Sequence, residues 1–371
     1  LIGNYESLFI SSSKENEIRR KASSGGIIRT LLTELIKSKK IDYVCILDQK
    51  KEKILSFDTL VTNSIQKILN SSQSIYQTTP ILHKLNRLKT NRKYAFVGLS
   101  EHIASLRILK NMYPKKFNHI KYLIGIYTGT NMYPGAINFY LKGNGISDLS
   151  EVRKINWRFG EWPGKLRIKT KHNRILSLEK FYYNYLIPFF ISKNSLITPD
   201  FTAELSDISI GDAWSPNLEN KGYGYSVVIT RLKEFDNILK RLSLKKKIDL
   251  NQISQSKAVS MHAHMIEFKK IGSFLRLEKL KKNGPIPLYD LKPERISFSR
   301  KIVENFIGLV ILICSKNLIK KLFSNINSNF LGFVFKILRQ FWKRISKPTK
   351  RKGLNNIKFT SISNSRLKEF F

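Results

Sequence analysis

Short apolar segments alternate with helical patterns in the first part of this 371-residue chain. The strand-like segments are residues 41–47, 93–98 and 122–127. Helices are expected over residues 27–36, 80–89 and 103–109, where apolar residues recur at helical spacing or follow a turn. This alternation predicts an α/β domain over about residues 20–140 with a parallel-type sheet. Polar groups after such strands lie at the edge where open parallel sheets bind ligands.

A small polar loop stands directly before the first apolar helix. It consists of Ser23, Ser24, Gly25 and Gly26. Free backbone N–H groups and small side chains at a helix start form a ready anion site, so a phosphate is one expected ligand. An ordinary serine N-cap is the alternative. The region has neither a G-x-G-x-x-G nor a G-x-x-x-x-G-K-[ST] pattern, so it indicates neither Rossmann nor P-loop binding.

A second candidate element lies in the middle of the chain. The alternation of Leu205, Ile208 and Ile210 predicts a short strand that ends in Gly211 and Asp212. A strand that ends in such a turn is a frequent place for a functional carboxylate. A buried strand with a purely structural turn remains the alternative.

Charge and cysteine content limit the class of protein. The chain has 66 Lys and Arg and 27 Asp and Glu, a net charge of +39 that attracts polyanions. Coding bias toward lysine is the alternative explanation, and no nucleic-acid-binding motif accompanies the charge, so nucleic acid is not the expected partner. Two cysteines, Cys45 and Cys314, exclude a disulfide scaffold and an all-cysteine metal site, and agree with a cytoplasmic location.

The second half of the chain has a different texture. Residues 166–170 and 174–178 are expected to form a β-hairpin. His262 and His264 lack a third ligand in the sequence, so no metal site is expected. Residues 271–300 are expected to be a Pro/Gly linker, and residues 347–352 a loose basic stretch.

The C-terminal part, residues 301–371, is strongly basic, with 15 Lys and Arg against 2 Glu. Its longest apolar run, residues 306–314, is about half the roughly 20 residues that span a bilayer. One helical face is expected to hold the apolar residues Phe330, Val334, Ile337, Leu338, Phe341 and Ile345. This pattern is typical of a helix on an anionic membrane surface, and equally of a helix docked on the main domain.

Five motifs occur in an order that resembles a known family. They are Ser23–Gly26, Val97–Gly98 with Ile103–Arg107, Trp162–Gly164, Asp207–Trp214 and Gly224–Arg231. Over residues 17–270 the chain is similar to the coenzyme F420 hydrogenase/dehydrogenase beta-subunit family. The resemblance implies an α/β flavoprotein that passes electrons between FAD, iron–sulfur clusters and a deazaflavin or another redox partner protein.

The resemblance also implies the positions that contact the cofactor, while no catalytic residue is assigned. Lys165 is added because its charge, directly after the Trp162–Gly164 motif, suits a phosphate. The implied cofactor-binding residues are Ser23, Ser24, Gly25, Gly26, Gly98, Lys165, Asp207, Gly211, Asp212 and Trp214.

The chain departs from the family where the family has cysteines. Gly98–His102 replaces Gly-Thr-Pro-Cys-Gln, Thr128 replaces a cysteine, and Asn194–Asp200 replaces Arg-Cys-x-x-Cys-x-Asp. Serine and threonine do not ligate iron as thiolates do. The sequence therefore predicts that the iron–sulfur cluster is absent and the metal site with it.

Two functions remain open. One is a flavin-dependent oxidoreductase of this family that works without clusters. The other is a catalytically degenerate relative that acts as a binding or scaffold protein at a membrane surface. The expected divisions are 1–75 (N-terminal α/β region), 76–270 (main domain), 271–300 (linker) and 301–371 (basic amphipathic helical tail). The expected location is cytoplasmic, with peripheral contact to a membrane.

Overall fold

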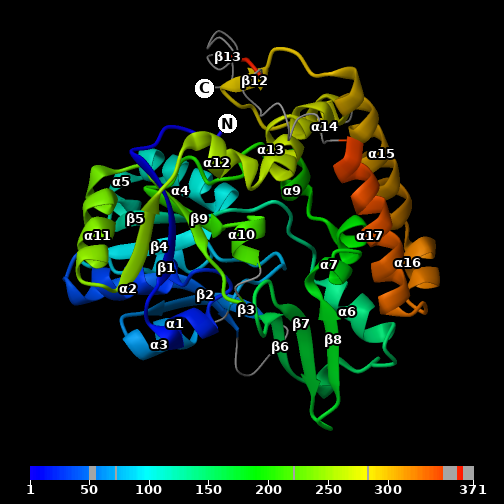
Figure 1. Ribbon diagram of the computed structural model, residues 1–371, viewed down its shortest axis with the longest axis horizontal. Helices are drawn as coiled ribbons and strands as arrows, with labels where there is room; N and C mark the ends of the chain where they lie inside the picture. Colours follow the sequence, from blue (N-terminus) through cyan, green and yellow to red (C-terminus); the bar gives the residue numbers. More distant parts are fainter. Residues whose placement is uncertain (50–55, 72, 220–221, 282–283, 346–356, 362–371) are drawn as a thin grey trace.

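An eight-stranded sheet forms the centre of the computed structural model (Figure 1). The structure describes all residues except 50–55, 72, 220–221, 282–283, 346–356 and 362–371. In spatial order the strands are β11 (Ile248–Gln252), β1 (Ser7–Ser13), β10 (Ser226–Thr230), β9 (Ile208–Asp212), β5 (Ile120–Ile126), β4 (Tyr94–Leu99), β2 (Tyr43–Gln49) and β3 (Phe57–Thr62).

The sheet is mixed, with a parallel centre. Strands β2, β4, β5 and β9 run parallel to one another, and each of the others runs antiparallel to its neighbour. The α/β expectation is therefore confirmed. Since β10 is antiparallel to β9 and β1 to β10, the start of β10 and the end of β1 lie at the carboxyl edge of the parallel strands, where Ser226 pairs with Asp212 and Ser11.

Helices bury both faces of the sheet. Alternate residues of each strand point to opposite faces. Thus Val44 and Ile46 of β2 join one apolar cluster, with Leu31 of α2, whereas Cys45 joins another, with Ile103 of α4. The covering helices are α2 (Ile27–Lys37) and α11 (Lys233–Leu244) on one face, and α4 (Ser100–Met112), α5 (Pro114–Phe117), α12 (Gln255–Ser260) and α13 (Ala263–Lys270) on the other.

A separate three-stranded sheet contains the expected hairpin. Its strands are β6 (Val152–Phe159), β7 (Lys165–Thr170) and β8 (Ile175–Glu179), all antiparallel. Trp157, Leu166 and Tyr140 are buried in one apolar cluster that joins this sheet to nearby helices. The remaining elements are α1 (Asn16–Lys21), α3 (Ile65–Asn70), α6 (Gly135–Lys142), α7 (Lys180–Tyr183), α8 (Leu186–Phe190), α9 (Lys193–Ile197), α10 (Pro216–Glu219), and the short 3₁₀ turns η1 (Leu85–Arg87) and η2 (Leu149–Glu151).

The helix expected over residues 80–89 was wrong. The segment holds only a turn and the η1 turn. Ile81 and Leu85 are both buried, as their apolar spacing predicts. Two buried side chains are enough to hold a tight turn in place. A regular helix of this length would gain little, because nucleation is costly.

The last part of the chain is folded onto the molecule as far as the structure describes it. It contains α14 (Gly272–Lys281), β12 (Leu291–Pro293), α15 (Phe298–Ser315), α16 (Asn317–Phe323), α17 (Ser328–Ile345) and β13 (Phe359–Ser361). Residues 271–300, expected to be a linker, thus include a helix and a strand that pairs with β13. Cys314 and Leu331 are buried in the cluster that holds Trp157. Residues 347–352 lie outside the described residues.

Candidate functional site

The loop of Ser23 to Gly26 lies at the carboxyl edge of the sheet, between β1 and β10. The Gly25 N–H donates to Ser226 Oγ (3.0 Å), and the Gly25 carbonyl accepts from the Ser13 N–H (2.7 Å). A Cβ on Gly25 would lie 2.5 Å from a backbone oxygen of β1, so only glycine fits. Gly26 has φ +82° and starts α2 without a side-chain cap. The loop is therefore fixed against the sheet by its own backbone.

Arg158 of β6 holds this loop, the end of β9 and a neighbouring turn together. Its Nη1 donates to Asp212 Oδ2 (2.9 Å), its Nη2 to the Ser23 carbonyl (2.8 Å) and its Nε to the Pro163 carbonyl. The side chain is buried. Burial lowers the pKa of Arg158, but Asp212, Tyr76 and Tyr183 together outweigh it, so the pKa is raised and the guanidinium stays charged. Arg158 was not among the residues expected at the site, because an arginine between two aromatic residues is a weak signal in the sequence.

Tyr76 sits between two cations at the same place. Its hydroxyl accepts from Lys180 Nζ (2.8 Å) and Arg158 Nη1 (3.1 Å), and Lys180 also donates to Tyr183 Oη (3.1 Å). Burial opposes ionisation of Tyr76, but Lys180 and Arg158 together outweigh it and lower its pKa. Two cations face one carboxylate, Asp212, so this cluster carries one positive charge in excess. Such an excess favours an anionic ligand.

Aromatic rings close the site on another side. Trp162 and Trp214 lie with ring centroids 4.4 Å apart, and both are half-buried. An added Cβ at Gly224 would lie 2.6 Å from Trp162 Cδ1 and 2.8 Å from Ser24 Cα, so Gly224 lets the ring approach the loop. Trp162 Nε1 is buried and has no hydrogen-bond partner within the described part of the chain.

A second guanidinium stands beside the loop, stacked on aromatic rings. Arg19 of α1 lies 4.6 Å from the ring centroid of Tyr225 and 5.3 Å from that of Tyr223. The Tyr225 carbonyl accepts from Ser24 Oγ (2.7 Å), which places this stack at the loop. Nε and Nη2 of Arg19 are buried and make no hydrogen bond to any described residue. Donors of this kind suit phosphate oxygens.

Other residues expected at the site either lie elsewhere in the fold or pack against neighbouring side chains. Asp207 directly precedes β9, at the end of that strand away from Asp212, where it accepts from the Leu123 N–H (2.7 Å) and pairs with Arg107 (2.5 Å). A Cβ on Gly98 would meet Phe96, and one on Gly211 would meet the ring of Tyr127. Lys165 begins β7, one residue after the Trp162–Gly164 turn, and is half-exposed.

Lys269 is buried against Ser195, one of the positions where the sequence predicts that a family cysteine is replaced. Lys269 Nζ donates to the Ser195 carbonyl (3.1 Å), and its side chain is 1% exposed. Burial lowers the pKa of Lys269 to about 8, although Glu101 acts in the opposite direction. Ser195 Oγ accepts from the Asn131 N–H (2.8 Å), and Thr198 is hydrogen-bonded to Tyr289. The described residues hold no group of three His, Cys, Asp or Glu suited to a metal.

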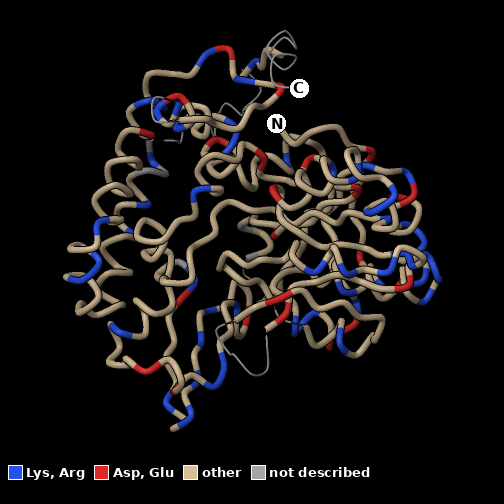
Figure 2. The backbone as a smooth tube through the Cα atoms, turned by 180° about the vertical axis from the view of Figure 1, so that it is seen from behind, with Lys and Arg blue, Asp and Glu red and all other residues tan. Residues whose placement is uncertain are grey.

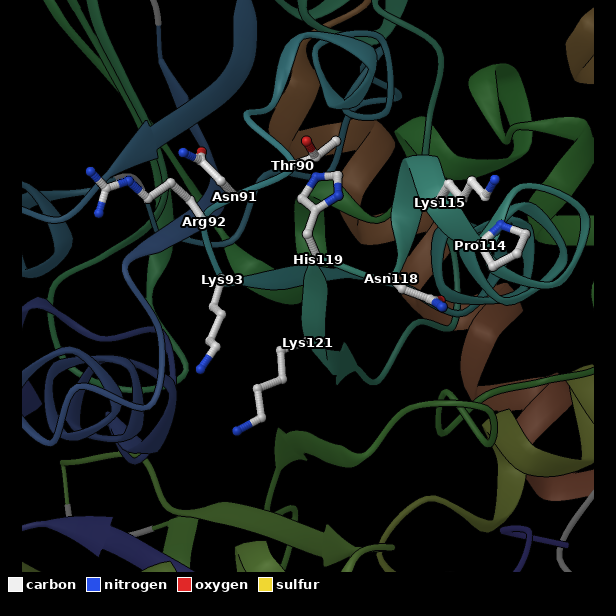
Figure 3. A pocket seen from close by; sticks show the side chains of 9 residues that line it. All are labelled: Thr90, Asn91, Arg92, Lys93, Pro114, Lys115, Asn118, His119 and Lys121. Atoms are coloured by element: carbon white, nitrogen blue, oxygen red, sulfur yellow. The ribbon is translucent and has the colours of Figure 1, made fainter.

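A pocket of about 580 Å³ lies at the opposite edge, at the amino ends of β4 and β5 (Figure 3). It is lined by Thr90, Asn91, Arg92, Lys93, Pro114, Lys115, Asn118, His119 and Lys121. It contains none of the residues expected from the sequence. The candidate site is therefore the carboxyl-edge cluster and not this pocket.

The fold is that of an α/β protein with a polar and aromatic cluster at the carboxyl ends of its parallel strands, the edge where such sheets bind ligands. Two family models for the beta subunit of coenzyme F420 hydrogenase/dehydrogenase match the chain. The model of the N-terminal part matches residues 9–86, and the model of the C-terminal part matches residues 91–256. The chain therefore belongs to the coenzyme F420 hydrogenase/dehydrogenase beta-subunit family, a redox-related family, and the resemblance is confirmed.

Relatives agree with this assignment. The chain is 26% identical over 257 residues to the coenzyme F420-dependent sulfite reductase of Methanocaldococcus jannaschii, covering 65% of this chain but only 38% of that protein. It is 25% identical to the coenzyme F420 hydrogenase subunit beta of Methanococcus voltae, covering 65% of this chain and 82% of that one. A chain of the F420-reducing [NiFe] hydrogenase complex from Methanosarcina barkeri has the same fold, with a TM-score of 0.59 at 18% identity over 76% of this chain and 94% of that chain.

Proposed function

We propose that this chain is a flavin-dependent oxidoreductase of the beta-subunit family that binds FAD at the carboxyl-edge cluster. The observation that supports it most is the pair of buried, unpartnered Arg19 nitrogens beside the Ser23–Gly26 loop, within the described residues. The excess positive charge around Tyr76 and the half-buried Trp162–Trp214 pair add to it. Together they suit a ligand with an anionic phosphate end and a planar ring.

The roles of the residues follow from their atoms. Arg19 would donate to phosphate oxygens, and Trp162 Nε1 would donate to a polar ligand atom. FAD, when bound, supplies the transfer of electrons. Tyr76 holds a proton at Oη between two cations, and its lowered pKa suits it to release and recover that proton near the ligand. Gly98, Gly211 and Asp207 are proposed to act through packing and the Arg107 ion pair.

We further infer that the protein works without an iron–sulfur cluster. The side chains at the cysteine positions are Glu101, Thr128, Ser195 and Thr198, which offer oxygen and no thiolate. The buried ammonium of Lys269 donates to the Ser195 carbonyl and interacts electrostatically with Glu101. These residues do not fit a cluster, and electrons are proposed to enter through a redox partner protein at the flavin itself. The naming of relatives as hydrogenase beta subunits supports such a partner.

A catalytically degenerate scaffold is the second candidate. It is favoured by the fact that Gly25 and the Ser24 hydroxyl are already used to pack the loop on β1 and β10. In either case we propose a cytoplasmic location with peripheral membrane contact through residues 301–371.

The first experiment is an absorbance spectrum of the purified protein with acid-released flavin and iron measured on the same sample. Near-stoichiometric flavin without iron is expected. Arg19→Ala should then weaken flavin affinity by roughly 10- to 100-fold, the equivalent of one lost charge-assisted hydrogen bond. Arg20→Ala, its exposed neighbour on α1, is the matched control and should bind flavin normally. A colourless protein that takes up no added flavin would refute the oxidoreductase and leave the scaffold.

A further inference from the structure

Exposed apolar side chains gather on the last three helices. Of the 25 large apolar residues that are exposed among the described residues, 11 lie between residues 298 and 341. We call these residues the helical flank. They are Phe298, Ile302, Leu309, Leu312 and Ile313 of α15, Leu318 and Leu322 of α16, and Phe330, Phe333, Ile337 and Phe341 of α17. Scattered single exposed apolar residues are normal, but a concentration of this kind marks an interaction surface.

Each of the two long helices, α15 and α17, exposes its flank residues on one side and packs against the rest of the protein with the other side. At 100° per residue, Phe298, Ile302 and Leu309 lie within an arc of about 40° on α15. The buried Cys314 lies on the opposite side of the same helix. The same holds for α17, where Leu331 and Phe335 pack into the core. Phe330, Ile337 and Phe341 on its other side are 50–59% exposed.

Charge on this surface has a single sign. Between residues 298 and 345 the only acidic residue is Glu304, which is 3% exposed and paired with Arg276 and Arg300. Lysine and arginine stand out along the flank, in blue in Figure 2. Among the residues whose side chains are described, the exposed cations are Lys301, Lys316, Lys321, Lys336 and Arg344.

We propose that the helical flank lies in the headgroup region of an anionic lipid bilayer, with α15 and α17 along the surface. Convex apolar side chains beside exposed lysines are typical of interfacial helices, whereas protein interfaces are depleted in lysine. Among the described helices none is long and apolar enough to cross a membrane alone. The pair α15 and α16 meets that test only together, with a bend of 78° between them. This proposal deepens the membrane-peripheral location and is independent of flavin binding.

The test is co-sedimentation of the purified full chain with phosphatidylcholine vesicles, with and without phosphatidylglycerol. The chain is expected to bind the anionic vesicles and to be released by salt. Lys316→Gln with Lys321→Gln should weaken this binding about 25-fold, since each lysine near an anionic surface contributes about fivefold. Phe333→Ser with Ile337→Ser should abolish binding to both vesicle types.

Matched controls lie on other parts of the surface. Lys115→Gln with Lys121→Gln removes two exposed lysines, and Ile108→Ser with Leu244→Ser removes two exposed apolar side chains. Both controls should bind vesicles as the wild type does. Equal binding by flank and control variants would overturn the proposal. A second result would also overturn it: light scattering shows a dimer that the Phe333 and Ile337 changes dissociate, and the wild type does not bind vesicles. Flavin is measured on each sample, so that a failure of vesicle binding can be distinguished from a failure of the proposed FAD binding.

Discussion

Lys269 provides a sharp test of how the interior is built. The folded protein keeps this side chain 1% exposed, with its Nζ bonded to the Ser195 carbonyl. Burial lowers the pKa of Lys269 from 10.5 to about 8. Below pH 8 both the folded and the unfolded chain hold the proton, and the folded state bears the whole cost of the buried charge. At 1.36 kcal/mol per pKa unit, that cost is about 3 kcal/mol.

The sign of the pH dependence follows. Between pH 8 and 10.5 the unfolded chain holds a proton that the folded chain has released, so stability rises with pH in this window. In Lys269→Met this contribution is absent. The variant should therefore have a higher free energy of unfolding than the wild type at pH 7. This difference in free energy should shrink by about 2 kcal/mol by pH 10. The Ser195 carbonyl loses its donor at both pH values, which shifts the gap by a constant and leaves its change with pH untouched.

The assay is urea unfolding of both proteins at several pH values between 7 and 10. Lys245→Met, which removes an exposed lysine, is the control for the general effect of losing a surface amine. The free energy of unfolding of this control should change with pH as that of the wild type does. If the stability of Lys269→Met changed with pH as that of the wild type does, the argument that the folded protein buries a charged ammonium beside Ser195 would fail.

Three further predictions concern other parts of the fold. Gly25→Ala places a Cβ 2.5 Å from the Ser11 carbonyl, and we expect it to lower the free energy of unfolding by about 1–3 kcal/mol in urea titrations. Asp207→Ala leaves the buried Leu123 N–H unpaired and should cost about 1–3 kcal/mol by the same assay, to which the partly exposed Arg107 ion pair adds little. No measurable loss would contradict the role of Asp207 in holding this strand. Burial lowers the pKa of His262 to about 4, so the unfolded chain takes up a proton that the folded chain refuses, and stability should fall between pH 6.5 and 4. His262→Gln should reduce this loss of stability in acid, as measured by urea unfolding. An equal loss in the variant and the wild type would refute the prediction.

Much of the central sheet was readable from local patterns. Strands β2, β4, β5, β9 and β10 are short apolar runs beside turns, and the hairpin of β7 and β8 has a polar connection between alternating arms. Strands β1, β3 and β11 were not predicted. Residues 8–13 hold three serines after an apolar start, and a strand is stabilised by its partners across the sheet as much as by its own residues.

The site was predicted only in part, because its key contacts join distant residues. Ser23, Ser24, Gly25, Gly26, Asp212 and Trp214 do come together. Arg158 is 135 residues from Ser23 along the chain and 54 from Asp212, so no local pattern links them. Arg19 was not among the residues expected at the site, because its buried nitrogens, unpartnered within the described residues, are a property of the fold.

The sequence by itself determined the family and the α/β class, because these depend on residue identity in ordered motifs. Only the tertiary structure decided that Asp207 bonds to the Leu123 N–H and to Arg107, whereas Asp212 pairs with Arg158 of the smaller sheet. It also decided which side of the basic helices is docked and which is exposed. Helical periodicity shows that a face is apolar, but whether that face meets protein, lipid or water depends on what the rest of the chain places against it.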